Sequence, residues 1–85
     1  MYNEIIMITI YSTPTCAFCH LAKTYLGAHD IEYTEIDVSA DQAAAEKMVA
    51  MSGQMGVPVI DIDGDITVGF HQPTIEAKLK DKNLL

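Results

Sequence analysis

The sequence has no tryptophan and no arginine, and its five basic residues are all lysines. Against twelve acidic residues, these lysines leave a formal net charge of −7 at pH 7. Such an excess of negative charge repels phosphate backbones and anionic lipid surfaces, which excludes a nucleic-acid or anionic-membrane binder. Only two cysteines are present among 85 residues, too few for the disulfide framework of a small secreted domain.

Long apolar runs are also missing from the chain. The longest run near the start, Ile5–Ile10, is too short to cross a bilayer as a helix. Glu4 stands where a secretion signal would carry basic residues, so we expect a cytoplasmic protein. No repeat, linker or low-complexity tract interrupts a sequence that is 49% hydrophobic, and we therefore expect one domain over residues 1–85.

The first half of the chain predicts a strand, a helix and a second strand. Residues 5–11 are nearly all apolar and rich in β-branched types, which is typical of a central strand covered on both faces. After a break at residues 12–15, helical spacing predicts a buried face made of Phe18, Leu21, Ala22, Tyr25 and Leu26. Residues 31–38 mix β-branched residues with acids, which indicates a half-exposed strand.

The second half predicts a helix, a hairpin and a final helix. Ser39 and Gln42 have the spacing of a capping box, and Gly53 is the expected end of the helix that follows. Two short strands, 57–62 and 66–70, flank an Asp-Gly pair that favours a tight turn, and Pro73 suits the first turn of a last helix. The order β-α-β-α-β-β-α predicts an α/β fold with a mixed four-stranded sheet and helices on both faces.

The two cysteines form the motif Cys16-Ala17-Phe18-Cys19, which follows the first strand and opens the first helix. Cysteines at this spacing lie within disulfide reach, roughly 4.4–6.8 Å between Cα atoms. Free N–H groups and the partial positive charge of a helix N-terminus can lower a cysteine pKa from about 8.5 to roughly 3.5–7.5. Because the thiolate is the attacking species in thiol–disulfide exchange, we predict Cys16 as the nucleophile and Cys19 as the resolving cysteine.

The charge distribution agrees with a reactive cysteine in this segment. No acidic residue stands between Ile5 and His29, although the whole chain is strongly acidic. A nearby carboxylate would disfavour a thiolate, so the sequence keeps acids away from the motif along the chain.

Other interpretations of the cysteines stay open. Free cysteines are often buried structural residues. With His20 the motif also matches the pattern of c-type haem attachment, which takes place in exported proteins. A closed zinc site needs four ligands, and His20, His29 and His71 lack regular ligand spacing, so we predict no metal site within one chain. The main alternative function is an iron–sulfur cluster or metal carrier that uses Cys16 in a dimer.

Three segments resemble the glutaredoxin family, which has a thioredoxin-like fold, and they occur in the family's order. They are Ser12-Thr13-Pro14-Thr15-Cys16-Ala17-Phe18-Cys19, Gly56-Val57-Pro58-Val59 and Val68-Gly69-Phe70. More narrowly, the chain is similar to small glutaredoxin-like redoxins of the YruB type and of the type that donates electrons to ribonucleotide reductase. The resemblance implies a dithiol–disulfide oxidoreductase that reduces protein or mixed disulfides, with disulfide-containing proteins as partners.

The resemblance also implies a substrate-binding surface. Pro58 is expected to be cis and to present the backbone of Val57 to an extended substrate, and Gly69 is expected to allow close backbone approach. The further positions carried over from the family are Thr13, Phe18, Phe70 and His71. We expect a monomer with no bound cofactor that binds neither nucleic acid nor membrane.

The electron donor is left open by the same comparison. Glutathione is one candidate reductant, but Thr13 stands where glutathione-dependent members carry a lysine, and Phe18 replaces their usual tyrosine. Phe70 instead resembles the redoxins that are recycled by a thioredoxin-reductase-type flavoprotein. The sequence therefore supports the thiol chemistry more strongly than either donor.

Overall fold

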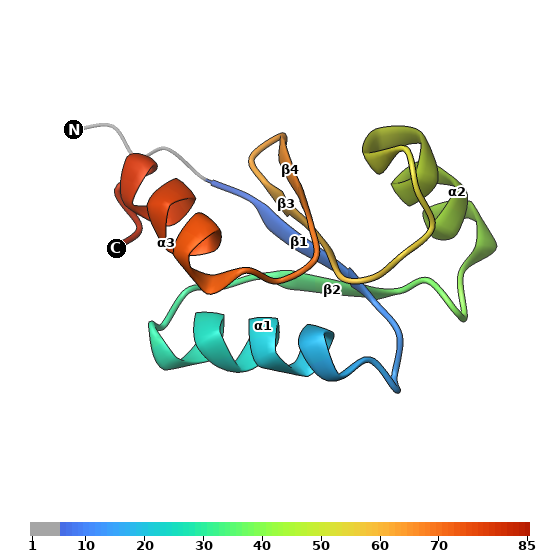
Figure 1. The fold of residues 1–85 in the computed structure, drawn as a ribbon, viewed down its shortest axis with the longest axis horizontal. Coiled ribbons are helices and arrows are strands. Elements are labelled where there is room, and N and C mark those ends of the chain that lie inside the picture. The colour runs from blue at the N-terminus through green and yellow to red at the C-terminus, as the bar shows by residue number, and fades with distance from the viewer. Residues whose placement is uncertain (1–5) are drawn as a thin grey trace.

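A computed structural model describes residues 6–85 of the chain. Its elements follow the predicted order (Figure 1). They are β1 (Ile8–Ser12), α1 (Ala17–Ala28), β2 (Thr34–Asp37), α2 (Gln42–Ser52), β3 (Val59–Ile62), β4 (Asp65–Val68) and α3 (Gln72–Asp81).

The four strands form one mixed sheet in the order β2-β1-β3-β4. β1 runs parallel to β2 and antiparallel to β3, and β3 pairs antiparallel with β4, so the predicted central position of the first strand is confirmed. β1 begins at Ile8, later than predicted, and continues to Ser12, because Ser12 pairs with Asp37 of β2. Ile5, the predicted first residue of the strand, lies outside the described residues.

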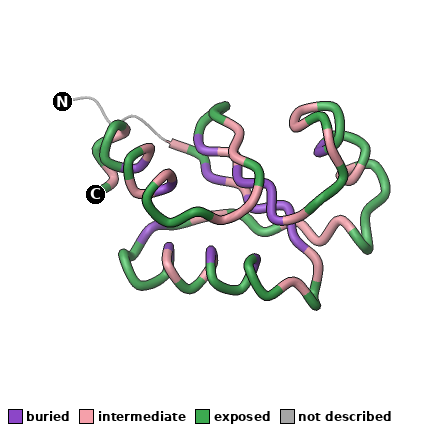
Figure 2. The backbone as a smooth tube through the Cα atoms, viewed as in Figure 1, coloured by how far each residue is buried: buried purple, intermediate pink, exposed green. Residues whose placement is uncertain are grey.

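Helices cover both faces of the sheet, as predicted. Leu26 of α1 and Leu79 of α3 pack with Ile10 and Ile60 in the larger core cluster. On the other face, Met48 of α2 packs with Tyr11 of β1 and with β3. Figure 2 shows that buried residues follow β1 and β3 through the middle of the molecule, which is where apolar side chains are removed from water on both sides.

The buried face of α1 differs from the predicted one. Cys19, Ala22 and Leu26 point to the sheet, whereas Phe18 and Leu21 are 58% and 52% exposed. With Cys19, Ala22 and Leu26 facing the sheet, positions 18 and 21 fall on the solvent side of the helix. The prediction that Phe18 and Leu21 belong to the core is therefore wrong.

The N-terminus of α2 is also capped differently from the prediction. The Asp41 carboxylate accepts a hydrogen bond from the backbone N–H of Ala44 at 3.0 Å, so Asp41 is the cap. The Ser39 hydroxyl instead donates a hydrogen bond to Oδ1 of Asp37, at 2.6 Å. Gly53 ends the helix as predicted, with a left-handed φ of 76° that glycine adopts without strain.

The predicted hairpin and last helix are confirmed. The two strands of the hairpin are shorter than predicted. Asp63 and Gly64 both have positive φ, which matches the twist of a tight β3–β4 turn. Pro73 lies in the first turn of α3 and Lys78 and Lys80 lie in its last turn, where they complement the helix dipole.

Candidate functional site

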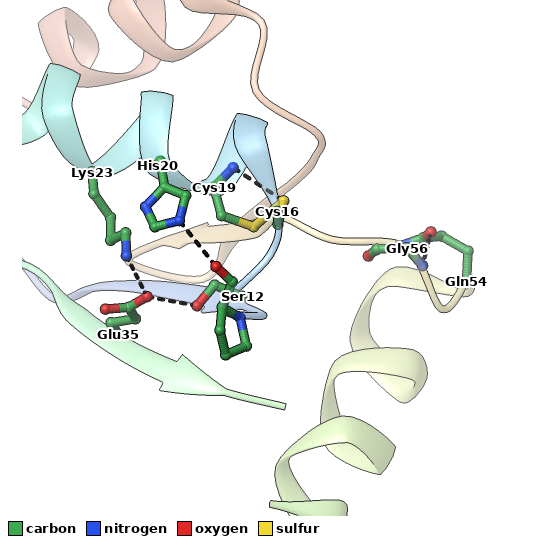
Figure 3. The surroundings of a disulfide bond; sticks show 9 residues. Ser12, Cys16, Cys19, His20, Lys23, Glu35, Gln54 and Gly56 are labelled. Carbon is green, nitrogen blue, oxygen red and sulfur yellow. Dashed lines mark hydrogen bonds and ion pairs between the residues drawn. A yellow bond between two sulfur atoms is a disulfide. The ribbon is translucent and has the colours of Figure 1, made fainter. Parts of the chain in front are cut away.

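The N-terminus of α1 places the two cysteines together in a disulfide (Figure 3). Cys16 is the N-cap, with extended backbone, and its Sγ accepts a hydrogen bond from the backbone N–H of Cys19 at 3.1 Å. The two Cα atoms are 5.2 Å apart, within the range that the helical spacing predicts. The local sequence alone therefore brings the pair into bonding geometry.

The two cysteines differ in their access to solvent. Cys16 is half-buried at the end of the helix, whereas Cys19 is completely buried against the sheet. No acidic residue lies in the first turn of α1, so the N–H groups at this end stabilise negative charge on Cys16 without a competing carboxylate in that turn. In the reduced protein this favours the thiolate at Cys16, the sulfur that solvent and partners can reach.

The sheet register brings the segment around Pro58 to the same end of the molecule. Tyr11 pairs with Val59, so the residues that follow β1 lie beside those that precede β3. The Val57–Pro58 peptide bond is cis, as the resemblance implied. The Pro58 carbonyl accepts a hydrogen bond from the N–H of Gly69 at 2.7 Å, and Gly69 has a φ of 82°. Val57, Pro58 and Gly69 thus lie together beside the loop that carries Cys16.

The other predicted substrate-binding residues lie in varied surroundings. The carbonyl of Thr13 accepts the N–H of Cys16 at 3.3 Å, and Phe18 projects into solvent from the first turn of α1. The Phe70 ring turns inward, with its centroid 5.8 Å from that of Tyr25. His71 is exposed and caps the start of α3 without a side-chain bond to the helix backbone. Their roles in binding stay predictions.

Two features of the site were missed by sequence reasoning. Met55 is 81% exposed in the loop before Pro58, where it lines a shallow pocket with Val49 and other residues of α2. The second feature is a polar network beside α1, in which Glu35 of β2 accepts hydrogen bonds from Ser12 and Lys23, each at 2.7 Å (Figure 3). In the sequence, Glu35 is one of several acids on a strand predicted to be half-exposed. No spacing or neighbouring residue connects it with the cysteine motif.

The same contacts set the ionisation of Glu35. The hydrogen bond from Lys23, followed by that from Ser12, holds the pKa of the Glu35 carboxyl below its ordinary value. Hydrogen bonds from Ser39 similarly lower the pKa of the Asp37 carboxyl. Both groups are carboxylates at neutral pH, so folding returns negative charge to the neighbourhood of α1 from β2.

Residues 6–85 contain no group of three or more His, Cys, Asp or Glu side chains arranged to hold a metal ion. Within the same residues, no helix is long and apolar enough to cross a membrane.

Comparison with known proteins places this site in a family. The glutaredoxin family model matches residues 8–67. A glutaredoxin-like 8.6 kDa protein of the Clostridium pasteurianum rubredoxin operon is 47% identical over 70 residues, covering 82% of this chain and 93% of that protein. The glutaredoxin-like protein NrdH of Lactococcus lactis is 36% identical over 73 residues, covering 86% and 99%.

The three-dimensional structure is also similar to that of a solved relative. The NrdH-redoxin of Escherichia coli, a glutaredoxin-like protein described as having a thioredoxin-like activity profile, superposes with a TM-score of 0.76 at 28% identity. The match covers 84% of this chain and 92% of that one. The same family is indicated by the order of the elements, by the cysteine motif on the first helix and by these relatives. The chain belongs to the glutaredoxin family and is a thiol–disulfide oxidoreductase of thioredoxin-like fold, with Cys16 and Cys19 as its CxxC pair.

Proposed function

We propose that the chain reduces disulfides in cytoplasmic proteins, with Cys16 attacking and Cys19 resolving, and that a thioredoxin-reductase-type flavoprotein returns the electrons. The observation that carries the assignment of roles is the unequal burial of two cysteines joined at one helix end. Cys16 is reachable and its sulfur accepts the N–H of Cys19, whereas Cys19 is completely buried.

The reaction follows from this asymmetry. The Cys16 thiolate attacks one sulfur of the substrate disulfide, which forms a mixed disulfide and releases the other substrate sulfur as a thiolate. Cys19 then attacks the Cys16 sulfur, forms the disulfide seen in the structure and releases the second substrate thiol. Two electrons pass to the substrate, and the flavoprotein supplies two electrons to reduce the pair again.

The charges around the site favour a flavoprotein over glutathione as the donor. Glutathione carries two carboxylates, and a site that selects it offers cations or free N–H groups. Lys23, on α1, is already paired with Glu35. At the start of α3, Pro73 has no N–H and the Thr74 hydroxyl lies 2.8 Å from Nδ1 of His71. The Escherichia coli relative, with its thioredoxin-like activity profile, agrees with this choice.

The donor is tested by coupling NADPH oxidation to reduction of a protein disulfide such as insulin. One arm contains thioredoxin reductase, and the other contains glutathione with glutathione reductase. We expect turnover in the first arm and only background in the second. Faster turnover with glutathione would overturn the choice of donor while leaving the thiol chemistry intact.

The roles of the cysteines are tested by matched serine variants in the same assay. Cys16→Ser should reduce turnover to the uncatalysed background, because no accessible thiolate remains. Cys19→Ser should still form a mixed disulfide, which mass spectrometry detects as a stable adduct, but should not complete the cycle. Full activity of Cys16→Ser would contradict the mechanism. A visible absorption band in protein purified without oxygen would instead support an iron–sulfur carrier.

A further inference from the structure

The loop between α2 and β3 is shaped by one side chain, that of Gln54. Its Nε2 donates a hydrogen bond to the carbonyl of Gly56 at 3.1 Å, and its Oε1 accepts the backbone N–H of the same residue (Figure 3). Two residues that face each other in an antiparallel sheet exchange the same pair of bonds. The Gln54 amide therefore holds Gly56 as a neighbouring strand would.

The Gln54 side chain is itself tied to the end of α2. Its Nε2 lies 3.3 Å from the hydroxyl oxygen of Ser52, the last residue of that helix. The Ser52 oxygen also lies 2.7 Å from the carbonyl of Met48 and 3.0 Å from that of Gln54. Met48 is 2% exposed and packs in the smaller core cluster. Hydrogen bonds therefore connect Gly56, through Gln54, to a helix that is anchored in the core.

Gly56 gives independent evidence for this contact, because its lack of a side chain makes room for the Gln54 amide. A Cβ at position 56 would lie 2.7 Å from Oε1 of Gln54, closer than Cβ atoms approach other atoms in real structures. Gly56 does not have the positive φ of Gly53 or Gly69, so its backbone conformation is open to other residues. Glycine is required at position 56 by the approach of Gln54.

The residue that this arrangement positions is Val57, which follows Gly56 toward the cysteine pair (Figure 3). On one side Gly56 is held by Gln54. On the other side the carbonyl of Pro58 accepts the N–H of Gly69 at 2.7 Å. Within residues 6–85, no hydrogen bond joins the N–H or the carbonyl of Val57 to another residue. Backbone groups that are fixed in place but unpaired can pair with an extended peptide.

We propose that Gln54 is a positioning residue that makes the site selective for disulfides in extended peptide segments, a proposal that rests on the function proposed above. By fixing Gly56, it holds the backbone of Val57 where a substrate segment pairs with it while Cys16 attacks the disulfide. Gln54 takes no part in the thiol chemistry. A disulfide without a peptide backbone should therefore react equally well with or without the Gln54 amide.

The expected size of the effect follows from the entropy of the loop. Without the Gln54 amide, the backbone at Gly56 and Val57 has to be ordered when the peptide binds. Ordering the backbone of one residue should weaken binding roughly tenfold, which corresponds to about 1.4 kcal/mol. The rate with a peptide disulfide should fall by the same factor, because attack by Cys16 follows binding.

The proposal is tested by stopped-flow reaction of the fully reduced protein with two disulfides that release the same coloured thiolate. One is 5,5′-dithiobis(2-nitrobenzoate), which has no peptide backbone. The other is the acetylated and amidated pentapeptide Thr-Val-Cys-Val-Thr, whose cysteine forms a disulfide with 2-nitro-5-thiobenzoate. Its β-branched residues favour an extended chain. With both disulfides, the first release of 2-nitro-5-thiobenzoate reports attack by Cys16.

Two variants remove the contact in different ways. Gln54→Met keeps the length of the side chain without its amide, and Gly56→Ala places a Cβ where the amide of Gln54 lies. Both should lower the second-order rate constant with the pentapeptide roughly tenfold and leave that with the small disulfide within about twofold. Gln42→Met is the matched control, because Gln42 is an exposed glutamine of α2 that bonds to Glu46. Its two rate constants should be unchanged.

A modified peptide isolates the backbone pairing. The same pentapeptide, N-methylated at its cysteine and at both valines, lacks the backbone donors that pairing needs. With the unmodified protein it should react roughly tenfold more slowly than the parent peptide. Gln54→Met should slow it no further, because two changes that remove the same contact are not additive.

Several results would overturn the positioning role. They are an unchanged rate with the pentapeptide in both Gln54→Met and Gly56→Ala, equal slowing with both disulfides, equal slowing in Gln42→Met, or a further loss when Gln54→Met reacts with the N-methylated peptide. A different result would overturn the function on which the proposal rests. In that case Cys16→Ser would keep the first release from both disulfides.

Discussion

At the scale of single residues, the chemistry depends on how differently neighbouring side chains are buried. Cys16 and Cys19 are three residues apart, yet one reaches solvent and the other lies in the core. Glu35 shows the same dependence on surroundings, because its two hydrogen bonds stabilise the ionised carboxylate in the folded chain. A charge that is stabilised by folding makes the stability depend on pH.

Glu35 should therefore contribute acid-sensitive stability. Folding lowers its pKa from the ordinary value of 4.5, so the contribution is complete above that value and is lost as pH falls through the folded pKa. Its side chain is 37% exposed, and we expect at most about 1 kcal/mol at neutral pH. Urea unfolding at about pH 6 and about pH 3 measures it, and the gap between unmodified protein and Glu35→Gln should close in acid. Glu32→Gln is the control, because Glu32 is an exposed residue just before β2, and its gap from the unmodified protein should not depend on pH in this way. A gap that widened in acid would contradict the assignment.

At the scale of elements, hydrophobic spacing located the helices, and tertiary contacts set their rotation and their ends. α1 has apolar residues on more than one side. Spacing alone therefore could not distinguish Phe18 and Leu21, which are exposed, from Ala22 and Leu26, which are buried. α2 has two polar residues before its first turn, and either could cap it. The bond between Ser39 and Asp37 removes Ser39 from that role, which leaves Asp41.

Removal of the true cap should destabilise α2. Asp41→Ala leaves the N–H of Ala44 without its side-chain acceptor and should lower the free energy of unfolding by about 1 kcal/mol. Ser39→Ala removes an exposed hydroxyl and should change it by less than about 0.5 kcal/mol. Urea titration of both variants compares them directly. If Ser39→Ala lowered the free energy of unfolding more than Asp41→Ala, Ser39 would be the cap, as the sequence indicated.

At the scale of the whole molecule, a small sheet with two thin helix layers leaves little surplus stability. Each central side chain of the larger cluster contacts residues from several elements, so its loss affects the entire fold. Exposed apolar side chains contribute little to stability, and they remain free to meet a partner. Phe18 and Met55 belong to this second group and flank the segments that carry Cys16 and Pro58.

Two leucines on one helix test this division. Leu26 is 1% exposed and Leu21 is 52% exposed, although both are on α1. Leu26→Ala should lower the free energy of unfolding by about 2–5 kcal/mol, since it leaves a cavity in the core. Leu21→Ala should lower it by less than about 0.5 kcal/mol. Chemical denaturation measures both, and equal losses would show that the sequence-based core assignment of Leu21 was correct.

The sequence by itself determined the order of the elements, the central first strand and the cysteine pair at a helix start. These depend on residues close together in the chain, whose spacing fixes which side chains share a face or a turn. Only the tertiary structure decided that Glu35 returns to the neighbourhood of an active-site segment without acids. Ser12, Lys23 and Glu35 lie on three elements, and their meeting depends on strand pairing and on the rotation of α1. Such long-range contacts leave no periodic trace in the residues that make them.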